Sequence, residues 1–111
     1  MTQNHRIEKD FLGEKEIPST AYYGIQTIRA NENFPITGYK IDPHLIEGIA
    51  IVKKSAAQAN LAVGQLDESI AQAIIQASEE IIDGKFHDQF IVDPIQGGAG
   101  TSVNMNANEV I

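Results

Sequence analysis

The chain contains no cysteine, and basic residues are scarce among its 111 residues. The lack of cysteine excludes disulfides, thiolate nucleophiles and cysteine-ligated metal sites. Eight lysines and arginines against fifteen acidic residues give a net charge of -7 at pH 7. We therefore expect neither nucleic acid nor an anionic membrane as a partner, because both are recognised through basic patches.

Long apolar runs are also missing. The densest apolar stretch, residues 49–52, is far shorter than a membrane span, and the first six residues lack the apolar core of a signal peptide. Apolar residues nevertheless make up 42% of the chain, which is enough for a folded core. These features predict one soluble, cytoplasmic domain over residues 1–111.

The residue pattern predicts a mainly α-helical fold with a short β-hairpin arm at its beginning. Residues 6–18 carry apolar side chains among charged ones, with Gly13 as a turn, which favours a hairpin or an extended arm. Pro18 and the two hydroxyl residues after it have the features of a helix start. Helical spacing then runs from residue 21 to about residue 33, before Pro35.

Two longer helices are predicted in the middle of the chain. Asp42-Pro43 combines a carboxylate cap with proline at the first helical position, and the helix ends near Gly64. Its expected buried face consists of Leu45, Ile49, Val52, Ala56, Ala59 and Val63. The next helix runs from Asp67 to about Gly84, with an expected buried face of Ile70, Ile74, Ala77 and Ile81. The short connection predicts an antiparallel pair.

The last quarter of the chain is predicted as a loop followed by a helix. Residues 86–96 lack periodicity, and Pro94 argues against a central strand, so we expect a tethering loop that buries Phe90 and Ile91. Residues 102–111 are typical of the opening of a helix but contain no closing glycine, basic residue or proline. We therefore expect the chain to be the front portion of a longer protein.

The segment with the most chemical character is the glycine-rich run at residues 96–102. Its glycines let the backbone approach a ligand closely, and Thr101 and Ser102 stand where the predicted helix begins. A helix N-terminus carries unpaired N–H donors and a partial positive charge, which attract carboxylate or phosphate. This pattern indicates an anion site with Thr101 as its best-placed side chain. A tight turn with a capping hydroxyl explains the same local pattern equally well.

Nucleotide-binding and metal-binding patterns fit this chain poorly. A Walker loop needs a lysine where Gly100 stands, and the dinucleotide fingerprint meets Val103 where glycine or alanine belongs. The three histidines are far apart and lack ligand spacing, so no metal and no organic cofactor is indicated. The asparagines of the last predicted helix are poor helix formers, and we interpret them as hydrogen-bonding to a neighbouring helix, with a ligand role for Asn104 left open.

Residues 96–110, which comprise the glycine-rich run and the predicted helix after it, resemble the first conserved block of the aspartase/fumarase superfamily. The segments 6–13, 21–27, 52–57 and 88–90 agree with the same superfamily in order, so the resemblance covers essentially the whole chain. A helical N-terminal domain of such a lyase, without the central helical bundle, is the fold that the resemblance implies.

Two details favour the aspartase branch of the superfamily. Class II fumarases carry a tryptophan before the Gly-x-Gln-Thr element and a Thr-Gly-Ser-Gly-Thr loop, whereas this chain has Tyr23 and Gly-Gly-Ala-Gly-Thr at those places. Argininosuccinate and adenylosuccinate lyases fit less well. Class II fumarase and a non-catalytic helical anion-binding or interaction module are the alternatives.

The resemblance implies the reversible anti-elimination of ammonia from L-aspartate, a small dicarboxylate, to give fumarate through an enediolate. Thr101 matches the family's carboxylate-binding threonine, and Gly100 and Ala99 match the backbone beside it; Ser102 and Asn104 are candidates for a supporting role. The family's base is a serine in a block absent from this chain. Members are homotetramers whose active sites combine segments of three subunits, so we expect this chain alone to be inactive. Divalent-cation activation of the whole enzyme is left open.

Overall fold

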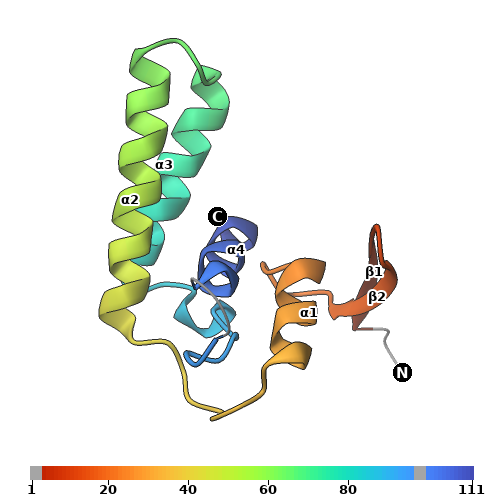
Figure 1. Cartoon of the computed structure of the whole chain (residues 1–111). Helices are drawn as coiled ribbons and strands as arrows, with labels where there is room; N and C mark the ends of the chain where they lie inside the picture. Colours follow the sequence, from red (N-terminus) through yellow and green to blue (C-terminus); the bar gives the residue numbers. More distant parts are fainter. Residues whose placement is uncertain (1–3, 97–99) are drawn as a thin grey trace. The chain divides into compact units, whose positions relative to one another are not determined.

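The computed structural model describes residues 4–96 and 100–111. It is mainly α-helical with one two-stranded sheet, which confirms the predicted fold class (Figure 1). The elements in order are β1 (His5–Asp10), β2 (Gly13–Pro18), α1 (Ile25–Asn33), α2 (Pro43–Ala62), α3 (Glu68–Ile82), the 3-10 turn η1 (His87–Gln89) and α4 (Thr101–Val110). Two compact units result, one from Met1–Ile41 with Gln89–Val110 and the other mainly from Asp42–Asp88. The single domain expected from the sequence stays a prediction.

The predicted hairpin is confirmed. β1 and β2 pair antiparallel from His5 opposite Pro18 to Asp10 opposite Gly13. Ile17 is fully buried and packs with Ala21 and Ile25, which come after β2 in the sequence. The hairpin therefore contributes its second strand to the small core of the first unit.

The start of α1 differs from the prediction, because Arg6 uses the backbone that was expected to become helical. The helix begins at Ile25, with Gly24 at the N-cap, and not around Thr20. The Arg6 guanidinium on β1 donates to four carbonyl oxygens, those of Pro18 (3.0 Å), Ser19 (3.3 Å), Ala21 (2.8 Å) and Tyr23 (2.9 Å). The Pro18 carbonyl also accepts from the Ala21 amide at 3.0 Å, so the backbone makes one tight turn here and no α-helical turn. The segment is therefore held as a bend.

The second unit is the antiparallel pair α2 and α3, as predicted (Figure 1). Asp42 caps α2 by accepting from the His44 amide at 2.7 Å, and Asp67 caps α3 by accepting from the Ser69 amide at 3.1 Å. Lys54 of α2 forms an ion pair with Glu79 of α3 at 3.1 Å. Local capping signals thus define both helix starts.

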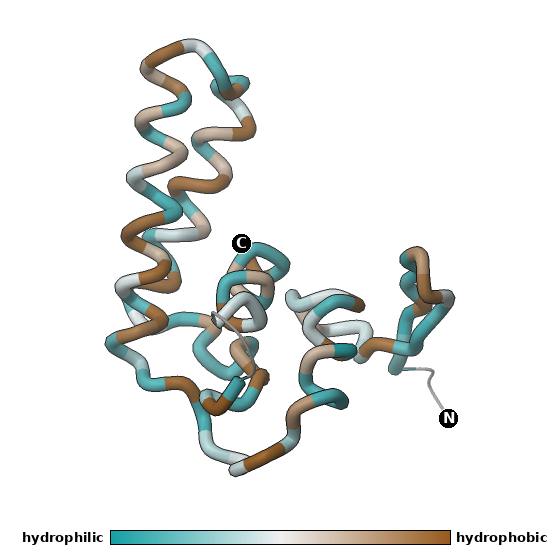
Figure 2. The backbone as a smooth tube through the Cα atoms, in the orientation of Figure 1, coloured by the Kyte–Doolittle hydropathy of each residue, from teal (hydrophilic) through white to brown (hydrophobic). Residues whose placement is uncertain are grey.

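The predicted buried face of α2 is wrong by about one residue around the helix. Leu45, Val52 and Val63 are 50%, 63% and 68% exposed. The buried residues of α2 are instead Ile46, Ala50 and Ala57. On α3, Ile81 is buried as predicted, but Ile70 is 53% exposed. Figure 2 shows apolar residues along the whole length of both helices.

Small residues explain this difference. Besides Ile46 and Ile81, the pair buries the small residues Ala50, Ala57, Ala71 and Ser78, and small side chains allow two helices to lie close together. Large aliphatic side chains on the adjacent face then stay outside the contact. No helix in the described ranges is long and apolar enough to span a membrane.

Replacing Arg6 with alanine should lower the free energy of unfolding by about 1–3 kcal/mol, because several partly buried carbonyls lose a charged donor. Urea denaturation of the two chains measures the difference. Lys9→Ala on the same strand is the matched control, since Lys9 is exposed, and it should change the value by less than about 0.5 kcal/mol. Equal effects of the two substitutions would show that the carbonyl contacts of Arg6 contribute nothing.

Candidate functional site

The residues that the sequence predicts for the site lie at the start of α4. Thr101 is the first residue of this helix and is exposed, Ser102 is the second and is half-buried, and Asn104 is exposed near the end of the first turn. Gly100 precedes the helix with φ +80, a left-handed conformation that favours glycine. Ala99 and the two glycines before it lie outside the described residues. The structure thus places the two hydroxyls on the first helical turn, where amide donors are unpaired within a helix.

Asn106 fixes the middle of α4 to the preceding segment. Its side chain is fully buried; its Oδ1 accepts from the amides of Ile91 (3.0 Å) and Val92 (3.4 Å), and its Nδ2 donates to the carbonyl of Gln89 (3.0 Å). The prediction of asparagine hydrogen bonds is right for this residue, but its partners lie in residues 89–92, from the end of η1 into the following loop, and not on a neighbouring α-helix. The loop buries Phe90 as predicted, and Val92 more deeply than Ile91.

Glu109 fixes the other end of α4 to α1. Its carboxylate accepts from four groups, the amides of Gly24 (3.0 Å), Gln26 (3.1 Å) and Thr27 (2.8 Å) and the hydroxyl of Thr27 (2.5 Å). Glu8 of β1 accepts from the remaining amide of this turn, that of Ile25, at 2.9 Å. Two carboxylates from elsewhere in the chain therefore replace the local cap that α1 lacks, and their charge suits a helix N-terminus.

Gly24 leaves room for both carboxylates. A Cβ atom at this position would lie 2.7 Å from Oε2 of Glu109 and 2.9 Å from Oε1 of Glu8. A side chain here would therefore force the ends of both carboxylate side chains to shift from these positions. This gives a structural reason for the glycine of the Gly-x-Gln-Thr element.

Asp93 holds the segment that leads into the glycine-rich run. Its carboxylate accepts from the amides of Thr37 (2.6 Å), Gly38 (2.8 Å) and Ile95 (2.9 Å) and from the Thr37 hydroxyl at 2.9 Å. Burial opposes ionisation of this carboxyl, but the hydrogen bonds outweigh it and lower the pKa of Asp93 to about 2. The 37–38 turn and the 93–95 segment are thereby joined through one charged group.

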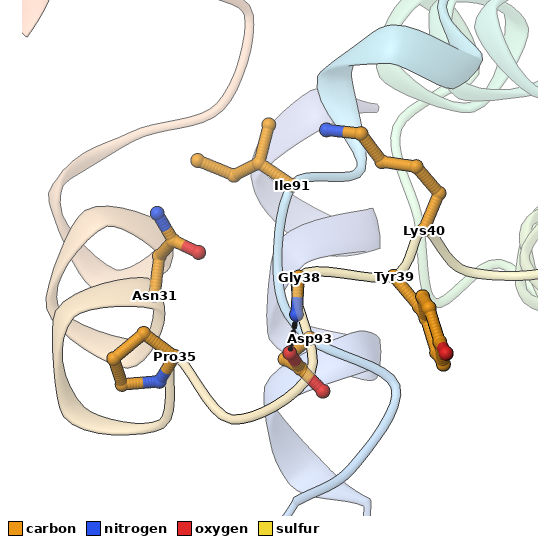
Figure 3. Close-up of a pocket in the computed structure, with 7 residues that line it drawn as sticks. All are labelled: Asn31, Pro35, Gly38, Tyr39, Lys40, Ile91 and Asp93. Atoms are coloured by element: carbon orange, nitrogen blue, oxygen red, sulfur yellow. Dashed lines mark hydrogen bonds between the residues drawn. The ribbon is translucent and has the colours of Figure 1, made fainter.

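A pocket of about 340 Å³ lies beside this junction (Figure 3). It is lined by Asn31, Pro35, Gly38, Tyr39, Lys40, Ile91 and Asp93. None of the described site residues on α4 lines it, so the pocket and the first turn of α4 are separate features. In Figure 3 the dashed line from Gly38 to Asp93 shows that the carboxylate is already engaged by the backbone.

Among the described residues, Thr101 has hydrogen-bond donors beside it at the start of α4, but no side chains enclose it. A reacting group needs water excluded and a base within hydrogen-bond reach, and an exposed residue provides neither alone. No cluster of three or more potential metal ligands occurs within residues 4–96 and 100–111. What α4 offers is a set of donors suited to one carboxylate group.

Sequence reasoning missed Glu109 and Asp93 as organising residues. An acidic residue in the last turn of a helix opposes the helix dipole, and that signal points to a partner outside the helix. Asp93 stands just before a proline, where a turn-forming aspartate is common and so gives no distinctive signal.

Comparison with known proteins gives consistent matches. A family model described as lyase matches residues 13–111. The chain is 70% identical over all 111 residues to an aspartate ammonia-lyase of Bacillus sp., and 50% identical over 111 residues to a class II fumarate hydratase of Halobacterium salinarum. It covers 24% of the length of each of these two relatives.

A solved structure of a Brucella melitensis protein titled fumarate lyase:delta crystallin superposes with a TM-score of 0.92 at 53% identity. The match covers 96% of this chain and 25% of that one. The fold of this chain is therefore one also found within a much longer protein.

Acidification should destabilise the fold partly through Asp93. Because its pKa is about 2 in the folded chain against an ordinary 3.8, its ionised form stabilises the fold fully above about pH 4, and this contribution is lost as the pH falls towards 2. Urea unfolding over this range measures the pH dependence. Asp93→Asn should reduce the slope of the free energy of unfolding against pH over this range, by an amount that corresponds to at most about one bound proton.

Thr37→Val is the companion variant, because it keeps the carboxylate and removes one donor to it. It should shift the acid loss of stability to higher pH. The same pH dependence in wild type and Asp93→Asn would contradict the assigned role of this carboxylate.

Proposed function

Because this chain belongs to the lyase family whose model matches residues 13–111, we propose that it is the N-terminal part of an aspartate ammonia-lyase. Such an enzyme converts L-aspartate reversibly to fumarate and ammonia. The observation that carries the proposal is the 70% identity over the whole chain to a Bacillus aspartate ammonia-lyase. Tyr23 before Gly24 and the Gly-Gly-Ala-Gly-Thr loop support the same branch.

The difficulty of the reaction is the removal of a weakly acidic proton from the carbon beside a carboxylate. The enediolate that forms concentrates two negative charges at one end of the substrate, so the site must present donors to that end. We assign Thr101 to this task, with the backbone of Ala99 and Gly100 beside it and Ser102 and Asn104 in support. One well-placed donor of this kind is worth roughly 3 kcal/mol of barrier.

The first turn of α4 suits this task on two counts. The Thr101 hydroxyl and the amides near it are donors, and the helix N-terminus carries a partial positive charge. Both favour the charge that develops on a carboxylate in the transition state. The base, a serine in the related enzymes, has to come from another part of the whole protein.

The whole protein is proposed to be a cytoplasmic homotetramer whose active sites combine segments of three subunits. This chain would supply one of those segments, which agrees with its covering 24% of the Bacillus relative. No organic cofactor is part of the proposal.

Class II fumarase is the second candidate, favoured by 50% identity over the whole chain to the Halobacterium enzyme. A fumarase would need the same carboxylate donors but would add water to fumarate in place of ammonia. The two candidates differ in the nucleophile, so a test of substrates separates them.

The full-length enzyme should release fumarate from L-aspartate, whereas the 111-residue chain alone should not, because the block that carries the base in the family is absent from it. Fumarate absorbance in the ultraviolet monitors both samples. Malate formation from fumarate, with no use of ammonia, would identify a fumarase. Fumarate release by the 111-residue chain alone would contradict the composite site.

Thr101→Ala in the full-length enzyme should lower turnover by about 10- to 1,000-fold, through loss of a donor to the transition state. Thr20→Ala, at an exposed threonine before α1, is the matched control and should leave turnover unchanged. Circular dichroism and urea unfolding check that both variants fold. Unchanged turnover in a folded Thr101→Ala enzyme would remove Thr101 from the site.

A further inference from the structure

We propose that Glu109 is a positioning residue that holds α4 in the orientation in which Thr101 meets the substrate carboxylate. The inference rests on the proposed function of Thr101 and adds a residue at the opposite end of the same helix. Glu109 touches no reacting group in this arrangement and acts through the helix that carries Thr101.

The placement of Glu109 favours its partner helix over its own. A carboxylate in the last turn of α4 opposes the dipole of α4, and no basic residue in that turn compensates for it. The same carboxylate lies at the N-terminus of α1, where the dipole favours it and where three amides and one hydroxyl donate to it. The contact with α1 therefore explains why a glutamate stands at position 109, although its charge is unfavourable at the end of α4.

Two attachments fix α4 as a rigid rod. Asn106 joins its middle to Gln89, Ile91 and Val92, and Glu109 joins its end to α1. A single attachment would leave rotation about that point free, and the second attachment removes it. Contacts in the second half of α4 thereby fix the orientation of its first half, which begins with Thr101.

The distance between Thr101 and the attachments of α4 makes the position of Thr101 sensitive to the tilt of the helix. When the Glu109 contact is weakened, Asn106 remains as the pivot; it lies about 7.5 Å along the axis from Thr101, so a tilt of about 8° displaces Thr101 by about 1 Å. A displacement of this size in a catalytic group lowers rates by about 100-fold. Weakening the Glu109 contact should therefore affect catalysis while the fold remains.

Glu109→Gln in the full-length enzyme tests the proposal, because the amide keeps the size but replaces one acceptor by a donor. It should lower kcat/KM for L-aspartate by about 10- to 100-fold in folded enzyme. Glu8→Gln is the matched control: Glu8 caps the same end of α1 but lies on β1, so it should leave kcat/KM within about twofold. An equal loss in both variants overturns the proposal, since α1 and not α4 would then be responsible.

A double-mutant cycle with Thr101→Ala separates positioning from a general structural effect. If Glu109 acts through Thr101, the variant with both substitutions has the kcat/KM of Thr101→Ala alone, within about twofold. Multiplication of the two single losses overturns the proposal. Thr27→Val, which removes only the 2.5 Å hydroxyl contact, takes the place of Glu109→Gln in the same cycle if that variant does not fold.

Amide hydrogen exchange of the full-length enzyme gives a readout that is independent of activity. Glu109→Gln should speed exchange in peptides from both α1 and residues 101–110, whereas Glu8→Gln should speed it in α1 only. If the wild-type enzyme releases no fumarate from aspartate, the proposed function fails. The exchange data still decide on Glu109, because unchanged exchange in residues 101–110 overturns the proposal.

Discussion

The contact between the Glu109 carboxylate and the first turn of α1 orients the two short helices of the first unit on each other. It joins residues 82 to 85 positions apart in the sequence and satisfies three amides and one hydroxyl with one side chain. The helices that it links have only 9 and 10 residues, a length at which isolated helices are marginal in water. Each helix is therefore stabilised by contact with the other, and Gly24 leaves room for the carboxylate.

The same principle recurs through this unit, because its apolar core is small. Polar side chains supply the hydrogen bonds that irregular backbone lacks. Arg6 donates to carbonyls after β2, Asn106 accepts from amides of the loop after η1, and Asp93 accepts from amides of the 37–38 turn. Apolar contacts are non-directional, whereas these hydrogen bonds fix distances and angles. A unit built this way gains defined positions for its helices along with its stability.

The sequence predicts those elements whose signals are local. Asp42-Pro43 and Asp67 define helix starts, Gly13 defines the hairpin turn, and the hydroxyl pair after the glycines defines the start of α4. The predicted start of α1 is wrong because the true start is set by Arg6 and Glu109, which are distant in sequence. The predicted buried face of α2 is wrong because the contact is made by Ile46, Ala50 and Ala57, whereas the larger side chains Leu45, Val52 and Val63 lie on the exposed side. The position of Thr101 at a helix start is predictable from local signals in the same way. Local chemistry does not identify the ligand of Thr101, however, and only the resemblance to a family indicates a substrate carboxylate.

Two helix N-termini in this unit face the same chemical problem in different ways. At α1 the amides donate to carboxylates of the chain itself, Glu8 and Glu109. At α4 the proposed partner is a carboxylate of the substrate, so the donors around Thr101 have to stay accessible to a ligand that comes and goes. The attachments that stabilise α4 must then lie away from its first turn, and Asn106 and Glu109 both lie in its second half. A helix that presents donors at one end and is anchored at the other reconciles ligand access with a fixed orientation.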